Sequence, residues 1–316
     1  MTRQKIYLKL SGFTMKNNQM PKTEYTAVAL GNFDGLHAGH REVLQKAYKY
    51  SLDENIRAVA LLFDIHPKAF LGKKIRLLMT EKEKQSEIEK IGLETEVISF
   101  EEYKNYSAED FVRVVLREKL NAKAVFCGFN YHFGKAQQGD AVVLRELCEK
   151  YGIEAYVNDE TFVDGEKVNS SRLRELLASG DVEKANRLMT KNFSYSFEVV
   201  HGQKRGRGMG FPTANQYFPP ELVIPRFGVY ASETVIDGKT YKSFTNIGSR
   251  PTFPEDDVRS ETHVFGFDGD LYGKIVRVTL HKFIRDERKF VSAEELVSQL
   301  AEDKRFTEEY FKKLEK

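Results

Sequence analysis

Hydrophobic and polar positions follow two different rhythms along the chain, and the first occupies residues 1–186. There, short apolar runs alternate with stretches in which apolar residues recur at helical spacing. The apolar runs predict strands at Thr26–Leu30, Ala58–Phe63, Glu96–Phe100, Ala124–Cys127 and Ile153–Val157. The helical stretches predict helices at His40–Asp53, Thr80–Ile91, Ser107–Lys119 and Ala141–Tyr151. This alternation predicts an α/β domain, a parallel sheet with helices on both faces.

The second rhythm occupies residues 187–316, where strand-like segments are separated by Gly, Pro and Asp turns such as Asp237-Gly238. The segments are SYSFEVVHG (194–202), FGVYASETVID (227–237), KTYKSFTNIG (239–248), ETHVFGFDGDLYG (261–273) and KIVRVTLHKFI (274–284). Helical spacing returns only at Ser292–Lys316. These patterns predict a second domain, a small antiparallel β-barrel with C-terminal helices.

Composition and charge narrow the partners that we expect. The chain has 316 residues, 41% of them hydrophobic, which is enough for two hydrophobic cores. Its 49 basic residues nearly balance its 47 acidic residues, and this balance argues against a nucleic-acid partner. The spacing of Cys127 and Cys148 fits no metal motif, so both are predicted to be free thiols in a reducing compartment. No apolar stretch suits a signal peptide or a membrane span. We expect a cytoplasmic protein without a membrane partner, a monomer or a weak homo-oligomer.

The stretch GNFDGLHAGH (31–40) joins the first predicted strand to a helix. Its glycines let backbone N–H groups approach a ligand, and the helix N-terminus adds a positive dipole. His37 and His40 share one helix face, so both could donate hydrogen bonds to one phosphate. A metal site and purely structural histidines are the alternatives, and the glycine-rich turn favours phosphate.

This stretch resembles the (G/N)-x-F-D-x-x-H-x-G-H motif of the nucleotidylyltransferase superfamily. The resemblance implies a Rossmann-like domain that catalyses attack on the α-phosphate of a nucleotide, with release of pyrophosphate. It also implies that the two histidines stabilise the charge of the transition state. The residues that it implies for ATP binding are Gly31, Asn32, Phe33, Asp34, His37, Gly39 and His40.

Residues 168–174, VNSSRLR, resemble the I-S-S-T-x-x-R element of the same superfamily. The resemblance implies that Ser170, Ser171 and Arg174 hold ATP phosphates, and that Arg174 is catalytic together with the two histidines. The residues alone predict that Ser170 or Ser171 caps a helix that extends through Ser179. Capping and phosphate binding are compatible.

LFDIHP (62–67) and CGFNYHFGKAQQGD (127–140) resemble two segments of the prokaryotic FAD synthetases. This resemblance implies that His66, Pro67, Asn130 and Phe133 bind flavin. The chain departs from the family pattern at three positions, which carry Asn130 in place of an acid, Gln137 in place of a basic residue and Asn169 in place of a serine.

Residues 202–215, GQKRGRGMGFPTAN, combine glycines with basic residues. Such a loop suits a polyphosphate, although an exposed hairpin turn has the same composition. The PTAN end is interpreted as a proline-stiffened turn that presents Thr213 and Asn215, whose oxygens are hard ligands for Mg²⁺.

This segment resembles the riboflavin kinase signature, and FGVYA (227–231), NIGSRPTF (246–253), ETHVFGFDGDLYG and FIRDERKF (283–290) continue the resemblance in order. It implies that Thr213 and Asn215 hold Mg²⁺, and that Glu261 contacts flavin and acts as general base on the ribityl 5′-hydroxyl. Arg285 is implied to contact flavin, and a salt bridge is equally open. The residues implied for ATP and Mg²⁺ are Gly202, Lys204, Gly206, Arg207, Gly210, Pro212, Thr213 and Asn215.

The two resemblances together match the bacterial bifunctional riboflavin kinase/FAD synthetase family. They imply that the barrel converts riboflavin and ATP to FMN and ADP, and that the first domain converts FMN and ATP to FAD and pyrophosphate. Mg²⁺ is the implied cofactor, and riboflavin, FMN and ATP are the implied small-molecule partners. Two alternatives remain, a riboflavin kinase with a weak or inactive adenylyltransferase domain, and a non-catalytic flavin or nucleotide sensor.

Overall fold

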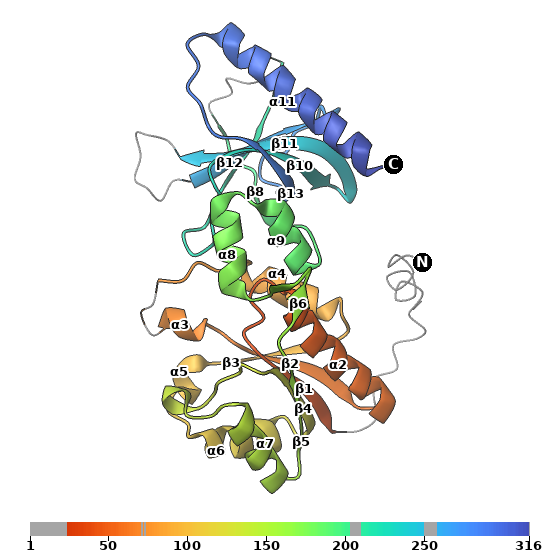
Figure 1. The fold of residues 1–316 in the computed structure, drawn as a ribbon, viewed down its shortest axis with the longest axis vertical. Coiled ribbons are helices and arrows are strands. Elements are labelled where there is room, and N and C mark those ends of the chain that lie inside the picture. The colour runs from red at the N-terminus through yellow and green to blue at the C-terminus, as the bar shows by residue number, and fades with distance from the viewer. Residues whose placement is uncertain (1–23, 71, 73, 203–209, 250–257, 316) are drawn as a thin grey trace.

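The chain forms two bodies that are joined by a pair of helices (Figure 1). The computed structural model describes residues 24–70, 72, 74–202, 210–249 and 258–315. A parallel sheet with its helices lies at one end of the molecule and an antiparallel barrel at the other. Helices α8 (Ser170–Ser179) and α9 (Val182–Met189) lie between them.

The first body contains a five-stranded parallel sheet in the order β3-β2-β1-β4-β5. The chain therefore leaves β1 in one direction for β2 and β3, and in the other for β4 and β5. The carboxyl end of β1 is the point where the strand order reverses, which is where such sheets bind ligands. All five predicted strands are confirmed: β1 Thr26–Leu30, β2 Arg57–Phe63, β3 Glu94–Ile98, β4 Ala122–Gly128 and β5 Glu154–Asn158.

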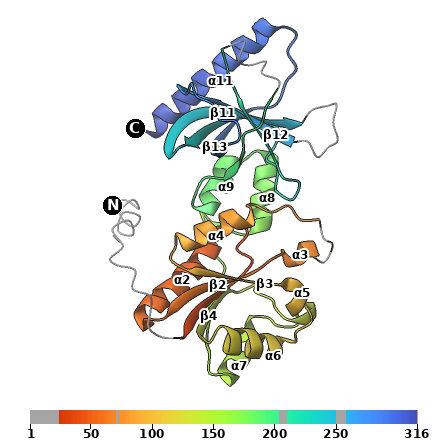
Figure 2. The ribbon, with the colours of Figure 1, turned by 180° about the vertical axis from the view of Figure 1, so that it is seen from behind.

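Helices cover both faces of this sheet, as predicted (Figures 1 and 2). Ala27 and Ala29 of β1 face the core under α2 and α4, whereas Val28 and Leu30 face the core under the other helices. The predicted helix at 107–119 is α6 continued by a π-helix, in which Leu120 N donates to Val115 O at 3.0 Å. The helices are α2 Ala38–Glu54, α3 Pro67–Phe70, α4 Glu81–Glu89, α5 Phe100–Tyr103, α6 Ala108–Asp110, the π-helix Phe111–Lys119, the 3₁₀-helix Lys135–Gln137 and α7 Ala141–Lys150.

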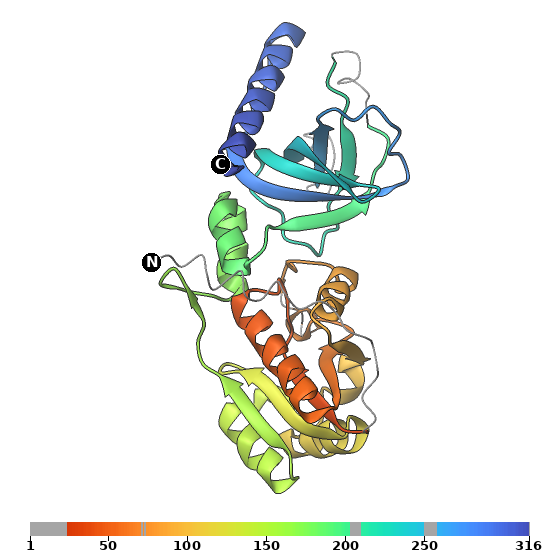
Figure 3. The ribbon, with the colours of Figure 1, turned by 90° about the vertical axis from the view of Figure 1, so that its right-hand side faces the viewer.

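The second body is an antiparallel sheet of six strands in the order β8-β13-β10-β11-β12-β9 (Figure 3). Its two edges meet where Val200 bridges Asn215 and where Gln216 Nε2 donates to Phe197 O at 2.7 Å and Val276 O at 2.8 Å. The sheet is thus a nearly closed barrel. The strands are β8 Ser194–Glu198, β9 Ala214–Tyr217, β10 Gly228–Ile236, β11 Lys239–Ser249, β12 Val258–Val264 and β13 Ile275–Arg285.

Three details of the barrel refine the sequence expectations. The Asp237-Gly238 turn joins β10 to β11 with φ of 47° and 79°, as expected for a two-residue hairpin. The interpretation of PTAN as a turn was wrong in part, because strand β9 begins at Ala214 and pairs with β12. The predicted carboxyl-terminal helical region forms one helix, α11 (Ala293–Leu314), which packs against β10 and β11.

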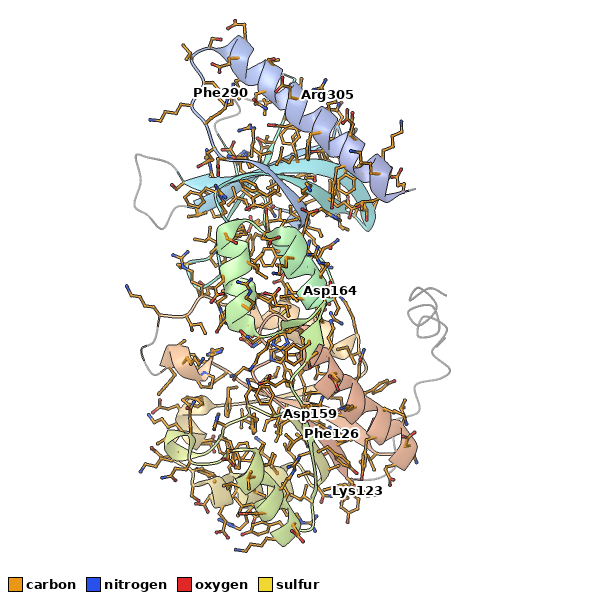
Figure 4. All side chains as sticks on the ribbon, in the orientation of Figure 1. Lys123, Phe126, Asp159, Asp164, Phe290 and Arg305 are labelled. Atoms are coloured by element: carbon orange, nitrogen blue, oxygen red, sulfur yellow. The ribbon has the colours of Figure 1, made fainter. Side chains whose placement is uncertain are left out.

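One hydrophobic cluster spans the junction of the two bodies. It includes Leu173 and Leu177 of α8, Leu188 of α9, and Tyr195 and Tyr230 of the barrel. The short hairpin of β6 (Phe162–Val163) and β7 (Glu166–Lys167) leads into α8, and the labelled Asp164 in Figure 4 marks its position beside the two helices. The two bodies therefore share a core.

The remaining sequence expectations concern cysteines and membrane segments. Cys127 and Cys148 are buried and free, as predicted, and burial raises the pKa of each thiol to about 12. Such thiols are inert at neutral pH. Among the helices that the structure describes, none has the length and apolar character needed to cross a bilayer.

Candidate active sites

The first candidate site lies at the carboxyl end of β1, where residues 31–37 turn into α2 (Figure 1). The backbone of this turn is left-handed at Phe33, Gly35 and Leu36, with φ of 50°, 81° and 42°. A Cβ atom on Gly35 would lie 2.5 Å from Leu78 Cδ1, so only glycine fits there. Phe33 and Leu36 are fully buried and anchor the turn in the core. The turn is therefore rigidly placed.

The two histidines predicted to bind phosphate lie together at the start of α2. His37 is the N-cap, and its Nδ1 accepts a hydrogen bond from His40 N at 3.3 Å. The rings stack with their centroids 3.7 Å apart. Burial lowers the pKa of His37 to about 4, and burial together with the charges of His37 and Lys84 lowers the pKa of His40 well below its ordinary value. Both rings are therefore neutral at pH 7 in the free protein.

Asp34 connects GNFDGLHAGH to VNSSRLR. Its carboxylate is 1% exposed, accepts a hydrogen bond from Leu78 N at 2.8 Å, and forms an ion pair with Arg174 Nη2. Burial raises the pKa of Asp34, and the nearby Arg174 opposes that rise. Arg174 Nε also donates to Arg76 O at 2.6 Å, and Ser170 Oγ donates to Asp34 O at 3.0 Å. Thus the two motifs, far apart in sequence, meet around one buried carboxylate.

The second candidate site lies on the barrel, where three polar side chains form a row across β9, β12 and β11. Glu261 is paired with Asn215 on one side and with Asn246 on the other. Asn215 is 7% exposed, and its Nδ2 donates to Thr213 O at 3.3 Å. A Cβ atom on Gly202 would lie 2.5 Å from Asn215 Nδ2, so the glycine-rich loop starts in contact with this row.

Two charged side chains border this row, those of Arg259 and Glu287. Glu261 forms an ion pair with Arg259 Nη2. Asn246 Nδ2 donates to Glu287 Oε1 at 3.4 Å, and burial, with a contribution from the Glu261 charge, raises the pKa of Glu287. The barrel site therefore presents amide and hydroxyl oxygens beside acidic groups, an arrangement suited to a cation, to phosphate bound through it, and to proton acceptance.

Comparison with known proteins assigns each body to a family. The family model for FAD synthetase matches residues 19–172, and that for riboflavin kinase matches residues 189–311. The bifunctional riboflavin kinase/FMN adenylyltransferase of Listeria monocytogenes is 32% identical over 294 residues, 91% of this chain and 93% of that protein. The Bacillus subtilis protein of the same name is 33% identical over 299 residues, which are 92% of this chain and 94% of that protein.

The chain belongs to the bifunctional riboflavin kinase/FMN adenylyltransferase family. Among solved structures, a Streptococcus pneumoniae protein named as a macrolide-efflux protein superposes with a TM-score of 0.82 at 28% identity. That match covers 93% of this chain and 97% of the other, so the arrangement of both bodies is shared. The sheet body corresponds to the adenylyltransferase match, and the barrel to the kinase match.

Within the adenylyltransferase half, the cap of α8 differs from the sequence expectation. Asn169 Oδ1 accepts a hydrogen bond from Arg172 N at 2.9 Å, so Asn169 is the N-cap and neither Ser170 nor Ser171 is. Asn169 has extended backbone angles one residue before the helix, which is the geometry a cap requires. Ser171 is exposed. The serines are therefore not needed for capping.

The residues predicted to bind flavin in this half do not all lie at the ligand edge of the sheet. His66 is 8% exposed, accepts a hydrogen bond from Lys68 N at 3.2 Å, and has its pKa lowered to about 4, chiefly by burial. Pro67 begins α3 directly after it. Asn130 is exposed after β4, whereas the ring of Phe133 is buried in the core beneath the π-helix. His66 and Pro67 lie at the ligand edge of the sheet, and Phe133 does not present its ring there.

Lys84 of α4 is a buried charged residue near the first candidate site that sequence reasoning did not single out. It is 4% exposed, and its Nζ donates to both Glu81 oxygens at 2.7 and 2.9 Å. Its charge acts on Asp34, His40 and His66, so it faces the phosphate site from the side of α4. Its spacing of four residues from the buried Ile88 puts a lysine on an apolar helix face, a signal that the sequence already carried.

In the kinase half, Arg285 has a partner within the fold. Its guanidinium forms two hydrogen bonds to the buried Asp303 of α11, at 2.9 and 2.7 Å. This is the salt bridge that the sequence left open, and flavin contact stays a prediction. His263 Nδ1 donates to Pro212 O at 2.9 Å and so fixes the segment before Thr213, a structural role. Lys204, Gly206 and Arg207 lie outside the described residues, and Gly210 is exposed.

The free energy of unfolding is expected to depend on pH through His37. The folded protein disfavours protonation of this ring because its pKa is about 4 rather than 6.5, so unfolding gains protons and stability falls as pH drops from about 6.5 to 4. The full loss from this one ring is about 3 kcal/mol. His37→Asn keeps a side-chain cap without a titrating group, and denaturant unfolding at pH 7 and pH 4.5 should show a smaller difference than in the wild type.

His132→Asn is the control for that measurement, because His132 is an exposed histidine of the same half. Its pH dependence of unfolding should equal that of the wild type. If His37→Asn also retains the wild-type difference, His37 does not titrate as the buried ring described above.

Proposed function

We propose that this chain phosphorylates riboflavin on its barrel and adenylylates the resulting FMN on its sheet domain. The observation that supports this most directly is that each half assembles its own constellation, His37, His40 and Arg174 around one edge, and Asn215 beside Glu261 on the other body. Relatives that match more than nine tenths of the chain carry both activities in their names. The two activities divide at residues 186 and 187 in this proposal.

For adenylyl transfer, the triphosphate of ATP binds at the N-terminus of α2, contacted by the turn 31–37 and by Ser170, Ser171 and Arg174. A phosphate oxygen of FMN attacks the α-phosphorus, the bond to the β-phosphate oxygen breaks, and pyrophosphate leaves. Ring N–H groups of His37 and His40 donate to the oxygens on which charge increases. Because the anionic phosphates favour protonated imidazole, binding raises the pKa of both rings.

For phosphoryl transfer, Glu261 accepts the proton of the riboflavin 5′-hydroxyl, whose oxygen then attacks the γ-phosphorus while ADP leaves. Thr213 Oγ1 and Asn215 Oδ1 would hold Mg²⁺. The donor set fits the ion, since Asn215 uses its Nδ2 in the bond to Thr213 O, and among the described residues its Oδ1 is left for a ligand. When bound, the cation neutralises charge on the phosphates.

Further parts of the proposal concern setting and partners. Buried free thiols and ATP as a substrate support a cytoplasmic location. The near balance of charges supports small molecules rather than nucleic acid as partners. A monomer or weak homo-oligomer stays our prediction.

One assay tests the proposal. Purified protein is incubated with riboflavin, ATP and Mg²⁺, and the flavins are separated by chromatography. We expect FMN and then FAD. FMN alone would support the second candidate, a kinase with an inactive adenylyltransferase half, which the exposed Asn130 and Gln137 favour because the family pattern has charged residues there. Unchanged riboflavin would contradict both enzymatic candidates and would support the non-catalytic flavin or nucleotide sensor.

Lys84→Met is expected to lower kcat/KM for FMN adenylylation about 10- to 100-fold, the value of a charge-assisted hydrogen bond to phosphate. Lys84 is buried and its charge acts on His40, and in this proposal its Nζ donates to the triphosphate in place of one of its two bonds to Glu81. Lys82→Met, at an exposed position on the same helix, is the matched control and should change neither activity. Steady-state FAD formation at varied ATP measures the effect, and equal rates in both variants would remove Lys84 from the site.

A further inference from the structure

A short extended segment of the sheet domain, residues 76–78, pairs with the kinase barrel. Leu77 forms a parallel bridge with Leu222, in which Leu77 N donates to Glu221 O and Val223 N donates to Leu77 O, both at 2.7 Å. In Figure 1 this contact lies in the region where the chain between α3 and α4 approaches the barrel and α8. The two halves are thus joined by backbone hydrogen bonds as well as by apolar contact.

The opposite edge of the same segment supports the adenylyltransferase site. Arg76 O accepts the hydrogen bond from Arg174 Nε at 2.6 Å, and Leu78 N donates to Asp34 Oδ1 at 2.8 Å. Polar groups of successive residues in an extended chain point to opposite sides. Leu77 therefore faces the barrel, while its two neighbours hold the Asp34–Arg174 pair. The segment is therefore bonded to the kinase half through Leu77 and to the phosphate site through Arg76 and Leu78.

The barrel also holds the helix that carries Arg174. Arg226 N donates to Leu177 O near the end of α8 at 2.9 Å, and the Arg226 side chain pairs with Asp286 at 2.8 Å. Leu222 and Val223 are buried in the shared hydrophobic cluster together with residues of α8. Both partners of the Asp34–Arg174 pair are consequently positioned by residues 221–226 of the barrel.

We propose that residues 221–223 of the kinase barrel are positioning residues for adenylyl transfer, which act through Leu77 and its neighbours on Asp34 and Arg174. The inference rests on the proposed function of the sheet domain. ATP binding for FAD formation then requires the docked barrel, because Arg174 would otherwise lose the carbonyl that orients its guanidinium. Phosphorylation of riboflavin does not use this bridge.

Val223→Pro tests the inference in the full chain, because it deletes the N–H that donates to Leu77 O. We expect the KM for ATP in FMN adenylylation to rise about tenfold or more, and the KM for ATP in riboflavin phosphorylation to change less than about twofold. Val223→Ala keeps the N–H and is the matched control for lost packing. Unchanged adenylylation in Val223→Pro, or an equal loss of both activities, would overturn the inference.

A double variant keeps the test decisive if Val223→Pro does not fold. Leu77→Cys with Leu222→Cys places thiols on bridge partners, which a disulfide can span. The reduced protein loses the packing of both leucines that holds the bridge together, so it should show the raised KM for ATP in adenylylation. Oxidation to the disulfide should lower that KM at least threefold. No effect of oxidation, or a further loss, would overturn the inference.

The two proposals fail in different ways. If the wild-type chain forms no FAD from FMN, the adenylyltransferase part of the proposed function is wrong, and the KM for ATP in adenylylation cannot be measured. Hydrogen exchange of the Leu78 amide then decides the inference, since this N–H is bonded to Asp34. Val223→Pro should increase its exchange rate at least tenfold relative to Val223→Ala, and equal rates would overturn the positioning role.

Discussion

Glu261→Gln is expected to abolish FMN formation, with kcat lowered about 10²- to 10⁴-fold, while FAD formation from supplied FMN stays at the wild-type rate. The amide has nearly the same shape as the carboxylate but cannot accept the proton of the 5′-hydroxyl. Glu261 lies in the centre of the Asn215–Glu261–Asn246 row, on a strand paired on both sides, so the substitution should leave the fold intact. Chromatography of the flavins formed from riboflavin and from FMN measures both reactions.

Glu198→Gln is the matched control, because Glu198 is an exposed glutamate of the same barrel. It should leave both reactions unchanged. If Glu261→Gln also stopped FAD formation from FMN, the assignment of the two reactions to separate sites would be wrong. If it left FMN formation intact, Glu287, whose carboxylate accepts a hydrogen bond from Asn246, would become the candidate base.

The sequence was sufficient to predict a strand where the local pattern of apolar residues determines the structure. The run at Thr26–Leu30 became β1 with the predicted bounds, because it is apolar on both faces and ends at a glycine. Strand β9 was missed since it is short and follows a proline, and it exists only because β12 supplies its partner. Predictions from local pattern succeed for strands with a clear apolar run and fail for short strands that depend on tertiary pairing.

The candidate sites show the same limit. Motif resemblance found GNFDGLHAGH and VNSSRLR, and the structure supplied the reason that they meet, the buried Asp34 bonded to Arg174. Lys84 and the Leu77–Leu222 bridge belong to no recognised motif, because their importance comes from what lies beside them after folding. Arg285 illustrates the reverse case, a residue within a motif whose charge is used by Asp303 in the fold.

The second large effect is expected for His40→Ala, which should lower kcat for FMN adenylylation about 10²- to 10³-fold and leave riboflavin phosphorylation unchanged. His40 stacks on His37, and its Nδ1 is buried without a hydrogen-bond partner in the described part of the chain. Negative charge increases beside this ring as the α-phosphorus is attacked, so the contribution of His40 is larger in the transition state than in bound ATP. Rates of FAD formation at saturating FMN and ATP measure the loss.

His132→Ala, at an exposed histidine of the same half, should keep the wild-type rate of adenylylation. The kinase reaction of each variant reports whether the chain is folded, because it takes place on the other body. His40→Ala should lower kcat and leave the KM for ATP unchanged, because it removes a hydrogen-bond donor to the reacting phosphate. Val223→Pro should instead raise the KM for ATP, because it misplaces a residue that contacts ATP in the ground state. A His40→Ala protein with unchanged kcat would place the charge stabilisation elsewhere, on Lys84 and Arg174.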